Sequence, residues 1–354
     1  MKNKFYYYTP VNNIVAVKTN IKGFSFSYGL AMPESTEHEY QKAIIKIELE
    51  QVKGNVEPEA GEKEKMGKFH YFNGYPDSGL IFYERSFFFK QKLQFKISGI
   101  DSNHIKVVVN KNYMKFVKHR FMNVHSMGYI LTDIINLRLM HNGFAPLHSS
   151  GIAIKDEGFG IFAPPNTGKT LTAMTLCMDK SNGMEFFAED LSLTDGEHFY
   201  SVPWTSTFRY YESVDSSKFS KFLNKLTDKV SVLELFSFGK TDPITEYVDE
   251  ISHKSQVSGI YILDRGTEKV YDISADEAFF RINTLDRYEF NYMRAPTIIA
   301  YEYFNPKTDI EKAYAKEREI LKEMIKTAKF VRVVCSDNAL RYSELIKKDL
   351  KVNE

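Results

Sequence analysis

Eight residues near the middle of the chain, APPNTGKT at Ala163–Thr170, constrain its folding more than any other segment. An apolar run, FGIF, precedes them, and a stretch of good helix formers follows. A Gly-Lys-Thr ending between a strand and a helix is the setting of a P-loop, G-x-x-x-x-G-K-[ST], whose main-chain N–H groups surround a phosphate. The sequence therefore predicts a strand, a phosphate-binding loop and a helix, in that order.

Two positions of this loop have specific predicted roles. Lys169 neutralises the β- and γ-phosphate oxygens, and the hydroxyl of Thr170 serves the metal. The other predicted cofactor-binding residues are Ala163, Pro164, Pro165, Asn166, Thr167 and Gly168. Ala163 replaces the first glycine of the template, which its backbone tolerates if φ is negative, and Asn166 readily enters the left-handed region. An accidental loop is the alternative, but a lysine at a helix N-terminus is unfavourable unless an anion binds there.

Four further polar residues are candidates for the same site. Glu189 and Asp190 end the next predicted strand, where carboxylates hold magnesium or accept a proton. A helix cap or a solvent-facing acid pair is the alternative. His148 lies fifteen positions before the loop, although a lone histidine is more often structural. Arg209, in WTSTFRYYE, is a candidate phosphate or substrate contact, although a solvated arginine is the commoner case.

The chain is expected to change character at about residue 125. Residues 1–125 alternate aromatic and β-branched runs with turn residues, which predicts a strand-rich antiparallel unit with an exposed charged loop over Gly54–Lys68. Residues 126–354 are expected to form the nucleotide-binding core with C-terminal helices. The predicted fold class is therefore α+β or α/β.

Periodicity and turn residues predict the elements of this second region. They are a helix at Met127–Met140, a hairpin of Gly151–Ile154 with Phe159–Phe162, a helix at Lys169–Met178, a strand at Gly183–Ala188, a helical insertion within 212–235, a hairpin within 259–273 that bends at Asp264–Thr267, and helices at about 309–329 and 338–350, the last capped by Ser336 or Asp337.

Composition limits the classes of function. The 47 basic and 46 acidic residues balance, so no global field favours nucleic acid or an anionic membrane as a partner. The N-terminus lacks the apolar core of a signal peptide, and no run approaches about 18 apolar residues, which predicts a cytoplasmic protein. Cys177 and Cys335 lie in separate apolar segments and are expected to be buried thiols. The nine histidines show no zinc-site spacing.

One block of the sequence resembles a known family. LHSSGIAIKDEGFGIFAPPNTGKTLTAMTLC, followed by FFAEDLSL, is similar to HPr kinase/phosphorylase and its relatives, which share a P-loop core with ATP-dependent phosphoenolpyruvate carboxykinases. In this resemblance His148 matches the active-site histidine, Lys169 and Thr170 match the phosphate and metal ligands, and Glu189-Asp190 matches the paired aspartates. Two positions depart from the family pattern, Ala163 in place of glycine and Glu189 in place of aspartate.

The resemblance is specific over residues 146–195 and looser over 24–350. GFSFSYGLAMPE resembles the HPr-kinase-like peptide kinases, including lasso peptide precursor kinases, and a counterpart of the phosphorolysis signature of true HPr kinases is not evident.

The resemblance implies a kinase that uses ATP or another nucleoside triphosphate with Mg²⁺. It would transfer the γ-phosphoryl group to a hydroxyl of a protein, a peptide or a small molecule, and Glu189 or Asp190 would accept the proton. One alternative is a non-catalytic nucleotide-binding regulator or an ATPase. Another is carboxykinase chemistry, for which the chain is short and lacks an additional His/Lys metal motif. The acceptor and homo-oligomerisation are left open by the sequence.

Overall fold

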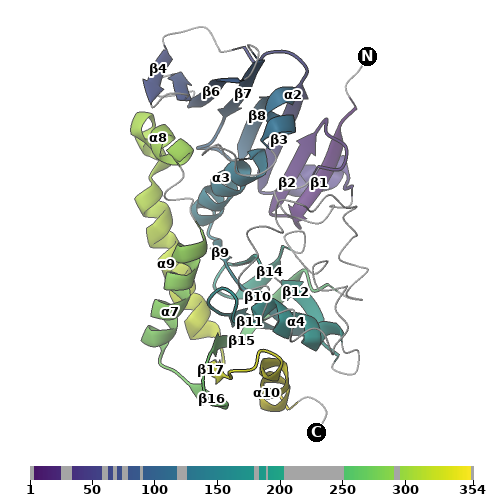
Figure 1. The fold of residues 1–354 in the computed structure, drawn as a ribbon, viewed down its shortest axis with the longest axis vertical. Coiled ribbons are helices and arrows are strands. Elements are labelled where there is room, and N and C mark those ends of the chain that lie inside the picture. The colour runs from purple at the N-terminus through teal and green to yellow at the C-terminus, as the bar shows by residue number, and fades with distance from the viewer. Residues whose placement is uncertain are drawn as a thin grey trace.

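The protein is a mixed α/β structure built on two β-sheets, seen here in a computed structural model (Figure 1). The structure describes residues 4–24, 34–57, 63–66, 70–73, 79–87, 91–117, 126–178, 183–188, 190–202, 251–290 and 296–351, without the side chains of 63–66, 70–73, 87, 289 and 296.

The first sheet has eight strands in the order β1-β2-β3-β8-β7-β6-β5-β4. The strands are β1 Tyr6–Val11, β2 Val15–Thr19, β3 Ile45–Val52, β4 Lys63–Met66, β5 His70–Asn73, β6 Leu80–Phe87, β7 Gln91–Ser98 and β8 His104–Asn110. β3 pairs in parallel with both β2 and β8, whereas the other neighbours are antiparallel. The predicted antiparallel unit is therefore a mixed sheet.

The predicted exposed loop at Gly54–Lys68 is wrong in two places. Residues 63–66 form the edge strand β4, which pairs with β5 through its main chain and so needs no apolar period. Val56 is buried, and its N–H donates to Oε1 of Gln94 at 3.1 Å. The pattern of charged residues does not predict these contacts, because the main chain of this segment makes them.

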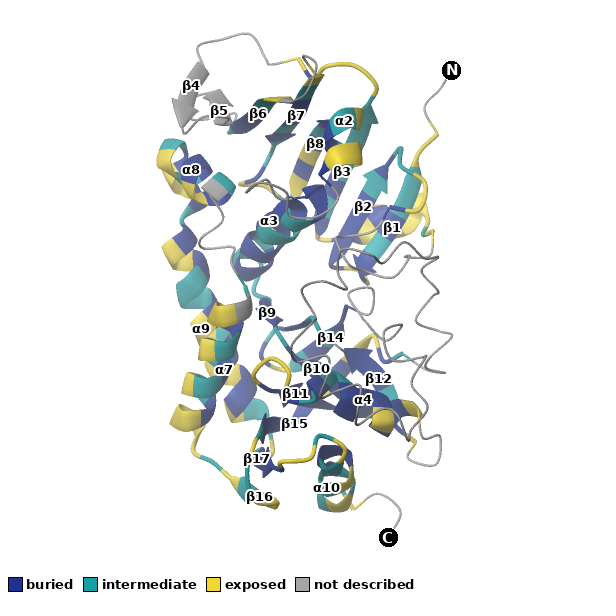
Figure 2. Ribbon diagram, viewed as in Figure 1, coloured by how far each residue is buried: buried dark blue, intermediate teal, exposed yellow. Residues whose placement is uncertain are grey.

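Three helices belong to the first half: α1 Glu37–Lys42, α2 Lys111–Phe116 and α3 Met127–His141. The predicted helix at Met127–Met140 is confirmed by α3, and Gly143 just after it has the positive φ of a helix stop, 85°. The apolar residues of α3 pack with the buried side of the first sheet (Figure 2). The predicted boundary at residue 125 falls in 118–125, outside the described residues.

The second sheet carries the candidate site. Its strands are β9 Ala145–Leu147, β10 Ser150–Ile154, β11 Glu157–Phe162, β12 Glu185–Ala188, β13 Ser192–Thr194, β14 His198–Ser201, β15 Lys254–Asp264, β16 Lys269–Asp272 and β17 Val331–Cys335. The order is β12-β10-β11-β15-β14-β13-β9, and β17 pairs with β15 and β16. The predicted β10–β11 hairpin and the predicted strand at β12 are confirmed.

The predicted hairpin within 259–273 is wrong. β15 and β16 are both strands, but β17 lies between them and pairs in parallel with β15. β17 is an apolar, mostly buried strand, so the interior position suits it better than the half-exposed β16. The turn residues between β15 and β16 therefore did not predict that each strand pairs with β17.

Helices cover both faces of the second sheet: α4 Lys169–Met178 and α10 Arg341–Asp349 on one face, and α7 Ala275–Glu289 and α9 Ile310–Thr327 on the other. The α8 helix Pro296–Phe304 and the short η6 Pro306–Thr308 precede α9. The predictions of α4 and α9 are confirmed. α10 begins later than predicted, after Leu340 and without a side-chain cap, because Ser336 instead accepts the N–H of Asn338.

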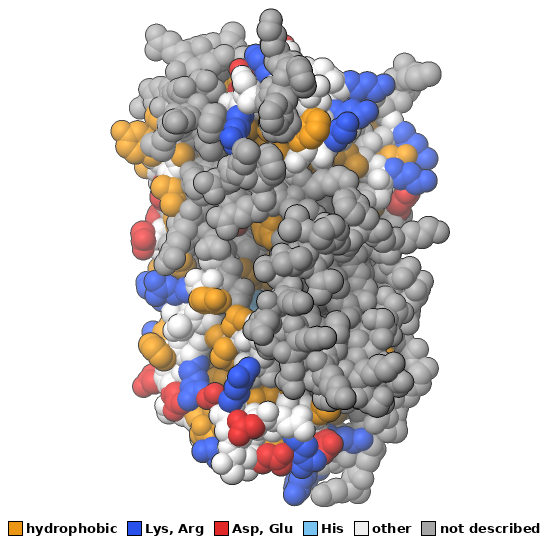
Figure 3. All heavy atoms as spheres, viewed as in Figure 1, with side chains coloured by type: hydrophobic (Ala, Val, Ile, Leu, Met, Phe, Trp, Pro, Cys, Tyr) orange, Lys and Arg blue, Asp and Glu red, His pale blue; other side chains and the backbone are white. Residues whose placement is uncertain are grey.

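The surface and the thiols agree with the composition. Cys177 and Cys335 are free and buried, as predicted. In Figure 3, acidic and basic side chains are interspersed at the lower end of the face shown. Ion pairs join Arg332 to Asp272 and Arg341 to Glu268. Within the described ranges, no helix combines the length and the apolar character needed to cross a membrane.

Candidate functional site

Sheet topology brings three separate segments together at one end of three adjacent strands, which is called the site edge of the second sheet below. β10 runs antiparallel to both β11 and β12, and the register pairs Ser150 with Ile161 and Gly151 with Ala188. The start of β10 therefore lies beside the ends of β11 and β12. Consequently His148, the loop after Phe162 and Asp190, which follows β12, meet at this edge, as the predicted order of elements implies.

A close approach between strands supports this arrangement at Gly151. A Cβ atom added there would lie 1.9 Å from the ring of Phe187, so only glycine allows this ring to cover the start of β10. The ring of Phe187 in turn stacks on Phe199, with centroids 5.2 Å apart. This packing holds the end of β12 next to β10.

The loop at Ala163–Thr170, called the candidate P-loop below, has the backbone expected of its sequence. Asn166 adopts the left-handed conformation with φ 60°, and Gly168 has φ 121°. Ala163 is fully buried and is not among the residues with positive φ, so the missing first glycine causes no strain. Lys169 and Thr170 open α4, whose N-terminal turn presents N–H groups to an anion.

Lys169, His148 and Asp190 form a compact cluster beside the candidate P-loop. Nζ of Lys169 lies 3.0 Å from Nε2 of His148 and 3.9 Å from Oδ1 of Asp190. Nδ1 of His148 lies 3.6 Å from the same carboxylate oxygen. Because an ammonium group only donates, Nε2 of His148 accepts and Nδ1 carries the ring proton toward Asp190. The structure thus brings together three of the predicted site residues.

Burial and charge make the imidazole of His148 a neutral group. Its side chain is only 12% exposed. Burial, followed by the nearby charge of Lys169, lowers the pKa of His148 to about 4, although Asp190 acts in the opposite direction. Near neutral pH the ring is therefore uncharged and is a weak base in the free protein. Asp190 differs in being 49% exposed, so solvent and ligands can reach its carboxylate.

Two predicted site residues, Glu189 and Arg209, lie outside the described residues. The predicted helical insertion at 212–235 does too. Among the residues that are described, no group of three or more His, Cys, Asp or Glu side chains is arranged to hold a metal. The oxygen donors of the described site that suit a hard cation are the hydroxyl of Thr170 and the carboxylate of Asp190.

Three residues of the site were missed by the sequence reasoning. Oδ1 of Asp286, on α7, accepts the main-chain N–H of His148 at 2.8 Å, and the ring of Phe290 lies edge-on to the imidazole at 6.4 Å. Nη2 of Arg265 donates to the carbonyl oxygen of Asn166 at 3.4 Å and adds a second cation beside the candidate P-loop. Arg265 was identified only as part of a turn, and no sequence signal links Asp286 to a residue 138 positions earlier.

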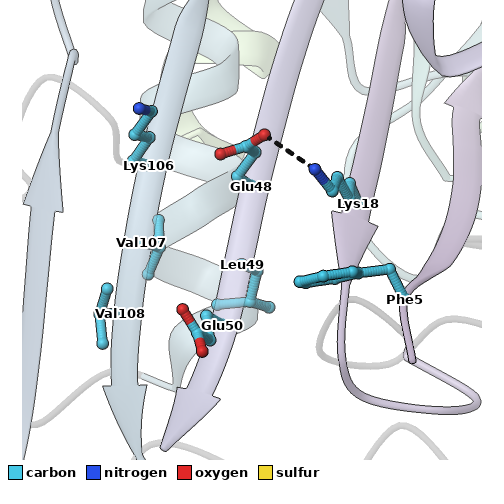
Figure 4. A pocket seen from close by; sticks show the side chains of 8 residues that line it. All are labelled: Phe5, Lys18, Glu48, Leu49, Glu50, Lys106, Val107 and Val108. Carbon is cyan, nitrogen blue, oxygen red and sulfur yellow. Dashed lines mark hydrogen bonds and ion pairs between the residues drawn. The ribbon is translucent and has the colours of Figure 1, made fainter. Parts of the chain in front are cut away.

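A depression on the first sheet is separate from this cluster (Figure 4). Its charged residues come from β2, β3 and β8, and two of them form an ion pair. Nζ of Lys18 pairs with Oε1 of Glu48 at 3.2 Å, and Nε2 of His104 lies 3.7 Å from the same oxygen. The depression therefore resembles a solvated sheet face, and we do not assign a ligand to it.

Replacing Ala163 with glycine is expected to leave nucleotide binding intact. The change restores the template glycine, and its negative φ is open to glycine as well. Loss of a buried methyl and added freedom of the unfolded chain should lower the free energy of unfolding by about 1 kcal/mol. Chemical denaturation and calorimetric titration with MgATP measure the two effects. An affinity loss of about tenfold or more would show that the methyl group shapes the loop.

His148 is expected to make stability depend on pH. The unfolded chain titrates this ring near 6.5, whereas the folded protein does so near 4. As pH falls through this window the unfolded chain alone binds the proton, so the free energy of unfolding decreases by roughly 3 kcal/mol. Asp133, whose pKa burial raises to about 7, has the opposite slope. The measurement is therefore the difference between wild type and His148→Gln, and a difference that is constant with pH contradicts the assignment.

Comparison with known proteins adds no further evidence for the site. No protein-family model matches the chain, and no curated protein matches it.

Proposed function

We propose that the protein is an ATP- and Mg²⁺-dependent kinase that transfers a γ-phosphoryl group to a hydroxyl acceptor. The observation that carries the proposal is the cluster of Lys169, His148 and Asp190 at the N-terminus of α4, next to a loop with two positive-φ residues. A cation, a helix N-terminus and a carboxylate in one place are the groups that phosphoryl transfer requires.

The proposed reaction needs groups that stabilise negative charge on the phosphate oxygens and a group that accepts the proton of the acceptor hydroxyl. The acceptor oxygen would bond to the γ-phosphorus while the bond from that phosphorus to the β–γ bridging oxygen breaks. Lys169 and the N–H groups of the candidate P-loop would stabilise the charge on the phosphate oxygens. A carboxylate at Glu189 or Asp190 would accept the hydroxyl proton. With its lowered pKa, His148 is better suited to orient Asp190 and Lys169 than to act as the base.

The described residues fit a magnesium ion shared with the nucleotide. Mg²⁺ in nucleotide sites is held by one or two protein oxygens together with phosphates and waters. Thr170 and the half-exposed Asp190 are the residues that would hold it, and the bound ion would neutralise charge on the phosphate oxygens. Glu189 remains a predicted third ligand.

Two partner classes remain part of the proposal. The acceptor would be a hydroxyl of a protein, a peptide or a small molecule, and the phosphoryl donor would be ATP or a related nucleotide. A cytoplasmic location and independence from nucleic acid remain predictions, supported by the balanced charge of the chain.

Incubation with γ-labelled ATP and Mg²⁺ tests the proposal. We expect label in a protein, peptide or small-molecule acceptor from a cell extract, with slower release of inorganic phosphate when water replaces the acceptor. Chelation of Mg²⁺ should abolish both signals. Tight nucleotide binding without either signal would instead indicate a non-catalytic regulator, and phosphate release without any labelled acceptor would indicate an ATPase.

A further inference from the structure

We infer that Asp286 is a positioning residue that holds His148 in the proposed kinase site, an inference that rests on the proposed function. The first observation is a break in the sheet. His148 and Ser149 connect β9, which pairs with β13, to β10, which pairs with β11 and β12. At this crossover, which lies between the two strands, the N–H of His148 donates to Oδ1 of Asp286 at 2.8 Å.

The second observation is that α7 is packed into the hydrophobic core of the second sheet. Its residues Ala278 and Ile282 are fully buried in the core that also contains Leu147 and Phe162. Asp286 itself is only 1% exposed, which is unusual for an ionisable side chain. Burial of a carboxylate is unfavourable unless hydrogen bonds compensate for its lost hydration. The hydrogen bond from the N–H of His148 therefore helps to stabilise Asp286 in this position.

The third observation is that α7 also contacts the ring of His148. The main-chain N–H of Phe290 donates to the carbonyl oxygen of Asp286 at 2.8 Å and closes the helix. The ring of Phe290 then lies edge-on to the imidazole, with centroids 6.4 Å apart. The C-terminal end of α7 thus fixes both the main chain and the side chain of His148.

This support has a specific consequence for catalysis. Nε2 of His148 contacts Lys169 at 3.0 Å and Nδ1 lies 3.6 Å from Asp190, so a shift of the 148–149 segment would move the imidazole away from both groups. A misplacement of about 1 Å is enough to lower turnover by about 100-fold. The candidate P-loop lies between β11 and α4, and neither element includes residues 148–149. A shift of that segment should therefore change nucleotide binding much less than turnover.

The test compares Asp286→Ala with Asp286→Asn, using MgATP and water as the acceptor and measuring phosphate release. For Asp286→Ala we expect kcat to fall at least about tenfold while KM for MgATP stays within about threefold. Asn retains an oxygen acceptor for the N–H of His148, so Asp286→Asn should keep kcat within about threefold of wild type. Loss of tenfold or more in Asp286→Asn would overturn the inference, even if Asp286→Ala does not fold.

Asp101→Ala is the control for loss of a hydrogen-bonded carboxylate. The Asp101 carboxylate accepts two hydrogen bonds, from the hydroxyls of Tyr301 at 2.6 Å and Thr308 at 2.8 Å, but it lies outside the site. We expect this variant to lower the melting temperature and leave kcat unchanged. An equal loss of kcat in Asp101→Ala, or a wild-type kcat in Asp286→Ala, would overturn the inference. A wild-type protein that neither binds nor hydrolyses MgATP would instead refute the proposed function.

Discussion

Replacing Lys169 with alanine or methionine is expected to abolish the thermal stabilisation of the protein by MgATP. Ligand at about 100 times its Kd should stabilise the wild-type fold by about 2.7 kcal/mol, which corresponds to a rise in melting temperature of about 4 °C for a chain of this length. Lys169 is the buried cation at the N-terminus of α4, with a side chain only 8% exposed. Methionine retains the apolar stem and removes the charge alone.

Differential scanning fluorimetry with a series of MgATP concentrations measures this effect. Lys348→Ala provides the control, because Lys348 is an exposed lysine in the last turn of α10, which packs against α4. The control should keep the full shift. An unchanged wild-type melting curve at millimolar MgATP would argue against phosphate binding by the candidate P-loop, and a full shift in Lys169→Met would remove Lys169 from the site.

The sequence predicted the candidate site well where its geometry is local. The strand, the candidate P-loop and α4 follow one another directly, so β11 and the first residue of α4 were placed correctly. The left-handed conformation of Asn166 follows from its residue type. The meeting of His148 with Lys169 depends on one antiparallel hairpin, and the turn at Lys155-Asp156 made that hairpin predictable.

Contacts between distant segments were beyond the same reasoning. β17 is separated from β15 by more than sixty residues, yet its insertion beside β15 decides where β16 lies. α7 was not predicted at all, because exposed Phe280 and Tyr288 obscure the apolar period of its buried residues. Asp286 therefore appeared as an ordinary acidic residue, and only the packing of α7 against the sheet brings it to His148.

Glu189 and Asp190 are expected to respond to substitution in different ways. Neighbouring residues at a strand end point in opposite directions unless the backbone turns. Oδ1 of Asp190 lies within 4 Å of both Lys169 and His148, at 3.9 and 3.6 Å, and in the proposed function Asp190 is a ligand of the magnesium ion. Asp190→Asn should therefore weaken Mg²⁺-dependent nucleotide binding by about tenfold or more, because a neutral amide is a poorer ligand for a hard cation.

Glu189→Gln is expected to leave nucleotide affinity nearly unchanged and to remove transfer. If Glu189 is the base, its loss should lower turnover by about 10²- to 10⁴-fold, since glutamine cannot accept the hydroxyl proton. Nucleotide affinity and phosphoryl transfer, each measured for both variants at several Mg²⁺ concentrations, separate the two roles. The reverse pattern would exchange the roles of metal ligand and base between the two residues. Wild-type transfer in both variants would contradict both assigned roles, because the loss of either carboxylate would then leave the proposed reaction unaffected.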